Sequence, residues 1–205
     1  MVDNDILIKA QALAEYIESR HFAPVTQRTP YFHMGATITD SVLQAGLNYR
    51  CVVYPRVLKL LTKFPNYRTT CDFLILMQTI PLPELIEWSN KRKLELIQNI
   101  SWLLFDNGVE TEPELAVWLN SSKSISQLQK LKGVGPKTID YLSMLSGNQA
   151  IAIDRHLFAF LRLAGIITNS YSDASVLYKK AADILSLSAF ELDRQIWRYM
   201  SDVVL

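Results

Sequence analysis

Lys137 and Asp154 are close in the sequence and have side chains suited to nucleophilic chemistry. A lysine amine that has lost its proton is a nucleophile, and a carboxylate stabilises positive charge that develops at a reacting carbon. An ordinary lysine is protonated at neutral pH, so attack requires burial or neighbouring cations that favour the neutral amine. Each residue also has a plainer interpretation. Lys137 could contact a phosphate, and Asp154 could be the N-cap of the helix that follows it.

The segment Leu131–Thr138 predicts a tight turn between two helices. Gly133 and Gly135 flank Val134, permit positive φ and let a foreign backbone approach closely. Pro136 suits the first position of the second helix. Backbone amides at such a turn, together with the positive end of the helix, form a cradle for an anion. Three lysines add positive charge: Lys130, Lys132 and Lys137. This helix-hairpin-helix pattern is typical of proteins that bind a nucleic-acid backbone without reading its sequence; the alternative is a glycine-rich turn with solvated lysines.

The turn and the segment Ile153–His156 together resemble the signature of the helix-hairpin-helix base-excision DNA glycosylases, the superfamily of endonuclease III and 8-oxoguanine DNA glycosylase. In that signature a lysine follows the second glycine, as Lys137 does, and an aspartate in an apolar-Asp-x-His context follows, as Asp154 does. The firm match covers about residues 128–165. The resemblance implies that Lys137 attacks C1′ of the nucleotide sugar, displaces the base and forms a Schiff base. It implies that Asp154 stabilises the positive charge on the sugar.

The resemblance also places a wedge loop in the segment Leu43–Arg50, where these glycosylases fill the gap left by a flipped nucleotide. Asn48 is the candidate wedge, with Tyr49 next; the alternative for Asn48 is a cap on the following helix. We expect DNA contacts from these residues: Lys132, Gly133, Val134, Gly135, Thr138, Asn48, Tyr49, Arg50 and Arg155. A basic segment between Asp40 and Asp72 supports DNA binding weakly, because such a run is usually a solvated helix face.

Composition narrows the class of protein. The 205 residues allow one domain or two lobes, and 49% hydrophobic with 20% charged residues indicates a globular chain. The net charge of +1 argues against a polybasic tail protein but permits a local basic patch. Two cysteines cannot supply four thiolates for a zinc site or an iron–sulfur cluster, so the cluster of endonuclease III is not expected. We expect no metal, no cofactor, no membrane and no secretion, and a cytoplasmic (nucleoid-associated) or nuclear location.

Helical periodicity recurs along the chain without a persistent alternating pattern, which predicts an all-α fold. Thr37–Asp40 resembles a capped helix start, and a basic helix is predicted over residues 49–64 with Pro55 near its first turn. Thr111 and Glu114 form a capping-box pattern. Asp154 occupies the N-cap position before residues 156–163.

The resemblance implies two helical lobes with an active-site cleft between them. One is a helical barrel over residues 37–147 that ends in the helix-hairpin-helix motif; the other combines residues 1–36 with 148–205. The expected function is a monomeric DNA glycosylase of base excision repair that excises a damaged or mismatched base from double-stranded DNA, with AP lyase activity. The alternatives are a monofunctional glycosylase, in which Asp154 activates water, and a non-enzymatic helix-hairpin-helix DNA-binding protein. The excised base is left open.

Overall fold

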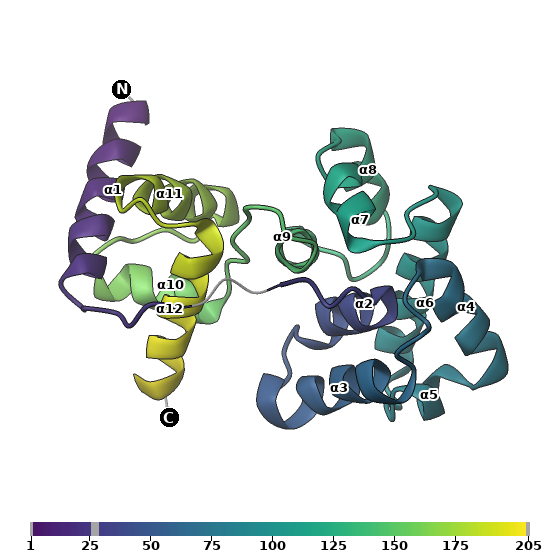
Figure 1. Cartoon of the computed structure of the whole chain (residues 1–205). Helices are drawn as coiled ribbons and strands as arrows, with labels where there is room; N and C mark the ends of the chain where they lie inside the picture. Colours follow the sequence, from purple (N-terminus) through teal and green to yellow (C-terminus); the bar gives the residue numbers. More distant parts are fainter. Residues whose placement is uncertain (1, 26–28, 204–205) are drawn as a thin grey trace. The chain divides into compact units, whose positions relative to one another are not determined.

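The computed structural model describes residues 2–25 and 29–203, and these residues form helices and no strand (Figure 1). The all-α prediction is therefore confirmed. The chain divides into two compact units. One spans Thr29–Asn148, and the other combines the described residues of Met1–Arg28 with those of Gln149–Leu205. Within the described ranges, no helix has the length and apolar character needed to cross a membrane.

The unit Thr29–Asn148 is built around the helix α2 (Met34–Leu43), all of whose residues are buried. Helix α2 packs against α3, α4, α6 and α9 (Figure 1). The other helical elements of the unit are η1 (Tyr49–Val53), α3 (Tyr54–Lys63), α4 (Thr70–Thr79), α5 (Leu82–Leu85), α6 (Lys91–Asp106), α7 (Glu112–Trp118), α8 (Ser122–Gln129) and α9 (Pro136–Leu145). Apolar side chains from these elements form one core around α2.

Helix α2 begins three residues before the capped start predicted at Thr37. Its N-cap is His33, whose Nδ1 accepts a hydrogen bond from the amide of Ala36 at 3.2 Å. The Thr37 hydroxyl donates instead to Oε1 of Glu112 at 2.8 Å, and the His33 amide donates to the same oxygen at 2.8 Å. The prediction was wrong because the hydroxyl of Thr37 serves a buried carboxylate far away in the sequence, which a local pattern does not reveal.

Gly35 allows α2 to lie unusually close to α4. A Cβ atom at this position would lie 2.5 Å from the ring of Phe73, closer than van der Waals contact permits. Phe73 is itself fully buried. Glycine is therefore required here for packing, since the ring has no room to move in a close-packed core.

His33 gives the unit an expected sensitivity to acid. Its Nδ1 must be unprotonated to accept the Ala36 amide, and burial lowers the pKa of His33 below its ordinary value. The folded state therefore binds this proton less readily than the unfolded state, so stability is lost as the pH falls below the ordinary histidine range. His33→Asn retains a capping oxygen without a titrating ring. We expect its free energy of urea unfolding to fall less than that of the wild type between about pH 7 and about pH 5.

The matched control for this measurement is His21→Asn, because His21 is exposed and lies in the other unit. This variant should keep the pH dependence of the wild type. Equal pH dependence in His33→Asn and the wild type would contradict the role assigned to His33.

The predicted basic helix over residues 49–64 is divided in the structure. Residues Tyr49–Val53 form a π-helix, in which the amide of Tyr54 donates to the carbonyl of Tyr49, and the α-helix α3 follows. Pro55 lies in the first turn of α3. Because proline has no N–H to donate to the carbonyl four residues earlier, a regular α-helix cannot continue through this point with all its hydrogen bonds.

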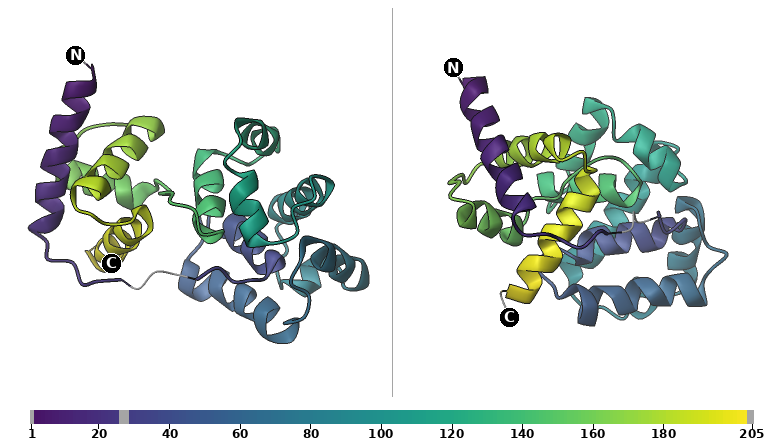
Figure 2. Two further views of the ribbon diagram at one scale, coloured as in Figure 1. Left: turned by 45° about the horizontal axis from the view of Figure 1, so that its top comes forward. Right: turned by 60° about the vertical axis from the view of Figure 1, so that its left-hand side comes forward.

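The second unit has its own hydrophobic core. Its helices are α1 (Val2–Glu18), α10 (Arg155–Leu163), α11 (Tyr171–Ile184) and α12 (Ala189–Val203). Helix α1 packs along α11, and α10 and α11 both pack against α12 (Figures 1 and 2). Phe160 is fully buried, and its ring is surrounded by three others, those of Tyr16, Phe22 and Tyr199, with centroids 5.4, 6.0 and 6.0 Å away.

Candidate nucleic-acid interface and lysine site

The glycine-rich segment forms a tight turn between α8 and α9. The Val134 amide donates to the Leu131 carbonyl at 3.1 Å, which closes a turn with Gly133 at its third position. Gly133 has a φ of +101°, a value that a β-turn of type II requires there and that favours glycine. Leu131 and Val134 pack against the core of the unit. The turn is therefore anchored by its apolar residues, and Lys132 and Gly133 are exposed at its tip.

Gly135 is the N-cap of α9, with Pro136 at the first helical position as predicted. Nothing lies within 4 Å of a Cβ atom placed on Gly135, so a side chain at this position would point into open space. The first amides of an α-helix have no intrahelical acceptor, and the helix end carries partial positive charge. This end of α9 is thus suited to an anion. Thr138, a predicted contact, is 7% exposed, so its side chain belongs to the packed part of the unit.

Lys137 is half-buried in the first turn of α9, and a second lysine lies near it. Lys93 on α6 donates from Nζ to the carbonyls of Val42 at 2.7 Å and Ala45 at 2.9 Å. Burial lowers the pKa of Lys93, and the positive charge of Lys137 lowers it further. The two amines are therefore electrostatically coupled. Sequence reasoning missed Lys93, because nothing in the local pattern of α6 indicates that it approaches α9.

Asp154 is the N-cap of α10, which confirms that part of the sequence interpretation. Its Oδ1 accepts the amides of His156 at 2.8 Å and Leu157 at 3.1 Å. Asp154 is half-buried. Burial raises the pKa of Tyr178, and the negative charges of Asp193 and Asp154 raise it further. The carboxylate is held in a fixed orientation by its two amide donors.

Arg155 lines a shallow hollow on the unit that contains Asp154. The hollow has a volume of about 240 Å³ and is also lined by Phe158, Arg162 and Asn169. Arg155 and Arg162 are exposed, and two guanidinium groups with an amide suit a phosphate. Arg162 was not predicted as a contact, although it follows Arg155 by seven residues, which is about two helical turns.

Asn48 is the N-cap of η1, as the second interpretation of this residue predicts. Its Oδ1 accepts the Cys51 amide at 2.9 Å, and the residue is exposed. Gln44, earlier in the same loop, has an Nε2 atom that is buried without a hydrogen-bond partner. Tyr49 is half-buried and Arg50 is exposed. The wedge role of Asn48 stays a prediction.

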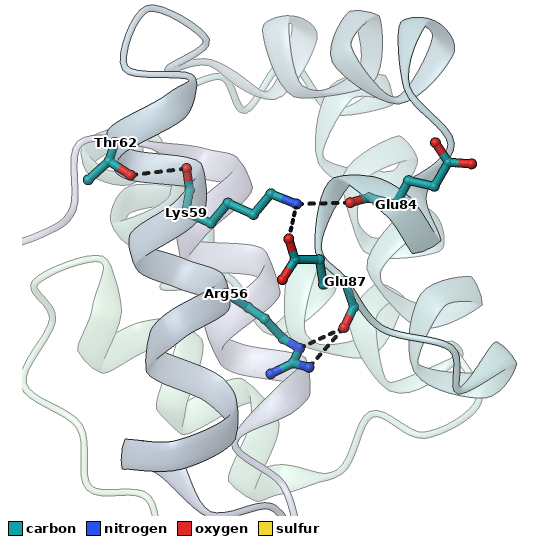
Figure 3. A network of polar contacts seen from close by, with 5 residues as sticks. All are labelled: Arg56, Lys59, Thr62, Glu84 and Glu87. Atoms are coloured by element: carbon teal, nitrogen blue, oxygen red, sulfur yellow. Dashed lines mark hydrogen bonds and ion pairs between the residues drawn. The ribbon is translucent and has the colours of Figure 1, made fainter.

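Two cations of the predicted basic segment serve the fold, as Figure 3 shows. Arg56 donates from Nε and Nη2 to the carbonyl of Glu87 at 3.1 and 2.8 Å. Lys59 donates to the Glu84 carbonyl at 3.0 Å and to Oε1 of Glu87 at 2.7 Å, and this hydrogen bond lowers the pKa of the Glu87 carboxyl. Glu87 has a φ of +52°, a strained value that these contacts hold in place. For Arg56 and Lys59 the structural interpretation is therefore preferred to DNA binding.

Among the described residues, no group of three or more His, Cys, Asp or Glu side chains is arranged to hold a metal ion. A family model described as "Domain of unknown function (DUF8548)" matches residues 88–201, more than half of the chain. The matched range contains both Lys137 and Asp154 and excludes the loop around Asn48. No curated protein and no solved structure matched the chain.

Proposed function

The chain belongs to the family described as a domain of unknown function, DUF8548, and we propose that it is a DNA glycosylase of base excision repair with associated lyase activity. The observation that carries the proposal is the place of Lys137. It lies in the first turn of α9, directly after the glycine turn, half-buried and next to the cation of Lys93. A turn that binds a DNA backbone would bring the sugar of a nucleotide to this amine.

In the proposed reaction the neutral amine of Lys137 forms a bond to C1′ of the sugar. The glycosidic bond breaks, its electron pair leaves with the base, and the base takes up a proton. The C1′–O4′ bond of the sugar then breaks as the nitrogen forms a double bond to C1′, and the proton lost by the amine goes to the ring oxygen. The product is the Schiff base from which the strand is cleaved. The amine must lose its proton before it attacks, because only the neutral form has an electron pair to form the new bond.

Asp154 has the second role in the proposal. Positive charge develops on the sugar as the base departs, and a carboxylate of fixed orientation stabilises it without reorganising. The two amide donors to Oδ1 supply that fixed orientation. The proposal requires two helical lobes whose cleft contains both Lys137 and Asp154, as the resemblance to the glycosylases implies.

The partner in this proposal is double-stranded DNA that contains a damaged or mismatched base. The helix-hairpin-helix turn contacts the backbone through Lys132, Gly133 and Gly135, and the hollow at Arg155 and Arg162 offers a second phosphate contact. The test is base release and strand cleavage on lesion-containing duplexes. A non-enzymatic DNA-binding protein would bind these duplexes and leave them unchanged.

Gly135→Asn tests the contact of the turn with DNA. Asparagine is a favourable N-cap, and the added Cβ meets nothing within 4 Å, so the fold should be retained. The larger side chain should block a phosphate from the amides of α9. We expect the affinity for undamaged duplex to fall about tenfold, because a hydrogen bond to a charged phosphate is lost. The melting temperature of the protein should not change. Fluorescence anisotropy at several salt concentrations measures this, and wild-type binding should weaken steeply with salt.

Ser121→Asn is the matched control, since Ser121 is the exposed N-cap of the preceding helix α8. Its affinity for duplex should equal that of the wild type. Equal affinities in Gly135→Asn and Ser121→Asn would exclude the turn as the DNA contact.

A further inference from the structure

Asp40 places a carboxylate in the interior of the unit Thr29–Asn148. The residue is fully buried in α2. Its Oδ2 accepts the hydroxyl of Tyr31 at 2.7 Å, and its Oδ1 accepts the hydroxyl of Tyr141 at 3.3 Å. A buried charge is costly unless donors compensate it. The carboxylate therefore orders the side chains that donate to it.

The contact between Tyr31 and Tyr49 has a defined direction. Their hydroxyl oxygens are 3.1 Å apart, and either could donate on distance alone. A phenol has one proton, and that of Tyr31 is used on Asp40. Tyr49 is therefore the donor to Tyr31. The result is a series of hydrogen bonds in which Tyr49 donates to Tyr31 and Tyr31 donates to Asp40. Tyr141 donates to the other oxygen of the same carboxylate.

The outer members of this series of hydrogen bonds, Tyr49 and Tyr141, lie on the segments that the proposed function uses. Tyr49 is the first residue of the π-helix η1 and follows Asn48. π-Helices are rare and are frequent at functional sites. Tyr141 is on α9 one turn after Lys137, so the two side chains share a face of that helix.

Lys93 forms hydrogen bonds with the backbone just before the loop that leads to Tyr49. Its hydrogen bonds to the carbonyls of Val42 and Ala45 hold the C-terminal end of α2 and the start of the loop that leads to Asn48. The loop is thus tied to α6 at its beginning and to Asp40, through Tyr49 and Tyr31, at its end.

We propose that Asp40 and the tyrosines Tyr31, Tyr49 and Tyr141 form a latch that positions η1 relative to α9. Asp40 is a positioning residue: when DNA is bound at the turn before α9, the latch holds residues 48–50 in place for the damaged strand. This inference rests on the proposed function for its role in excision, whereas the latch itself exists without DNA and is testable without it.

Hydrogen exchange of the free protein tests the latch directly. The amides of Val53 and Tyr54 donate to the carbonyls of Asn48 and Tyr49, so they report the closure of η1. Tyr141→Phe removes a single hydroxyl, on a different helix. We expect amide exchange at Val53 and Tyr54 to become about tenfold faster, because the latch loses one hydrogen bond to a charged acceptor.

The matched control is Tyr67→Phe. Tyr67 is 38% exposed in the same unit, and its ring packs edge-on against Phe64. Exchange at Val53 and Tyr54 should be unchanged in this variant. Unchanged exchange in Tyr141→Phe would overturn the latch, and so would equal acceleration in both variants.

A double-mutant cycle on base release tests the functional part. Tyr141→Phe and Tyr31→Phe each remove a hydroxyl that donates to Asp40, so each should slow single-turnover excision about tenfold with duplex affinity retained, and the double variant should be no slower than either. Independent effects, giving about a hundredfold loss in the double variant, would overturn the coupling. If the wild type excises no base from any duplex, the proposed function fails, and the exchange measurement still decides the latch.

Discussion

Lys137→Gln is expected to abolish the covalent adduct that borohydride traps between the protein and a duplex with an abasic site. Borohydride reduces a Schiff base to a stable amine, and glutamine has no nucleophilic amine with which to form one. Glutamine keeps a polar side chain that is one atom shorter than lysine, and the turn keeps its two other lysines, Lys130 and Lys132. The affinity for duplex should therefore be largely retained. Gel electrophoresis of the reduced mixture measures the adduct.

Lys123→Gln is the control for this substitution, because Lys123 is an exposed lysine in the first turn of α8. It should trap as much DNA as the wild type. If Lys137→Gln traps as much DNA as Lys123→Gln, another amine forms the Schiff base and the role assigned to Lys137 is wrong. Base release without any trapped adduct in the wild type would favour the monofunctional mechanism, in which Asp154 activates water.

Asp154→Asn is expected to slow base release by about a hundredfold or more, the usual effect of removing a group that stabilises charge in the transition state. This substitution should remove the charge of Asp154 without disturbing the helix cap. Asparagine caps helices as well as aspartate does, and its side-chain oxygen can accept the amides of His156 and Leu157. The variant should therefore keep the melting temperature of the wild type and lose only the charge. Single-turnover kinetics on a lesion-containing duplex measures the rate.

Asp173→Asn supplies the comparison, since Asp173 is an exposed aspartate in the first turn of α11 in the same unit. Its excision rate should equal that of the wild type. A wild-type rate in Asp154→Asn would show that Asp154 is a helix cap and nothing more.

The sequence predicts well those features that depend on neighbouring residues. The capping box of α7 is formed as predicted, with the Glu114 carboxylate accepting the Thr111 amide at 2.9 Å. Pro136 at the start of α9 and Asp154 before α10 also follow local rules for helix ends. The pattern at Thr37 fails because its hydroxyl has a distant partner, Glu112, that competes with local capping.

Features that depend on contacts between distant segments are not visible in the sequence. Asp40 looks like part of a helix start, yet it is the buried acceptor for tyrosines from two other segments. The charge of the segment around Arg56 and Lys59 suggests a free basic face, but backbone carbonyls take up both side chains. Such partners are fixed by the packing of helices, and charge counting does not reveal them.

Treatment of the wild-type protein and a panel of duplexes with borohydride decides whether the protein is a DNA glycosylase with lyase activity. The panel contains uracil, thymine opposite guanine, oxidised purines and pyrimidines, alkylated purines and abasic sites. We expect release of at least one of these bases, and a covalent adduct on the same duplex and on the abasic duplex. Binding to every duplex with neither base release nor adduct on any of them would rule out glycosylase and lyase activity.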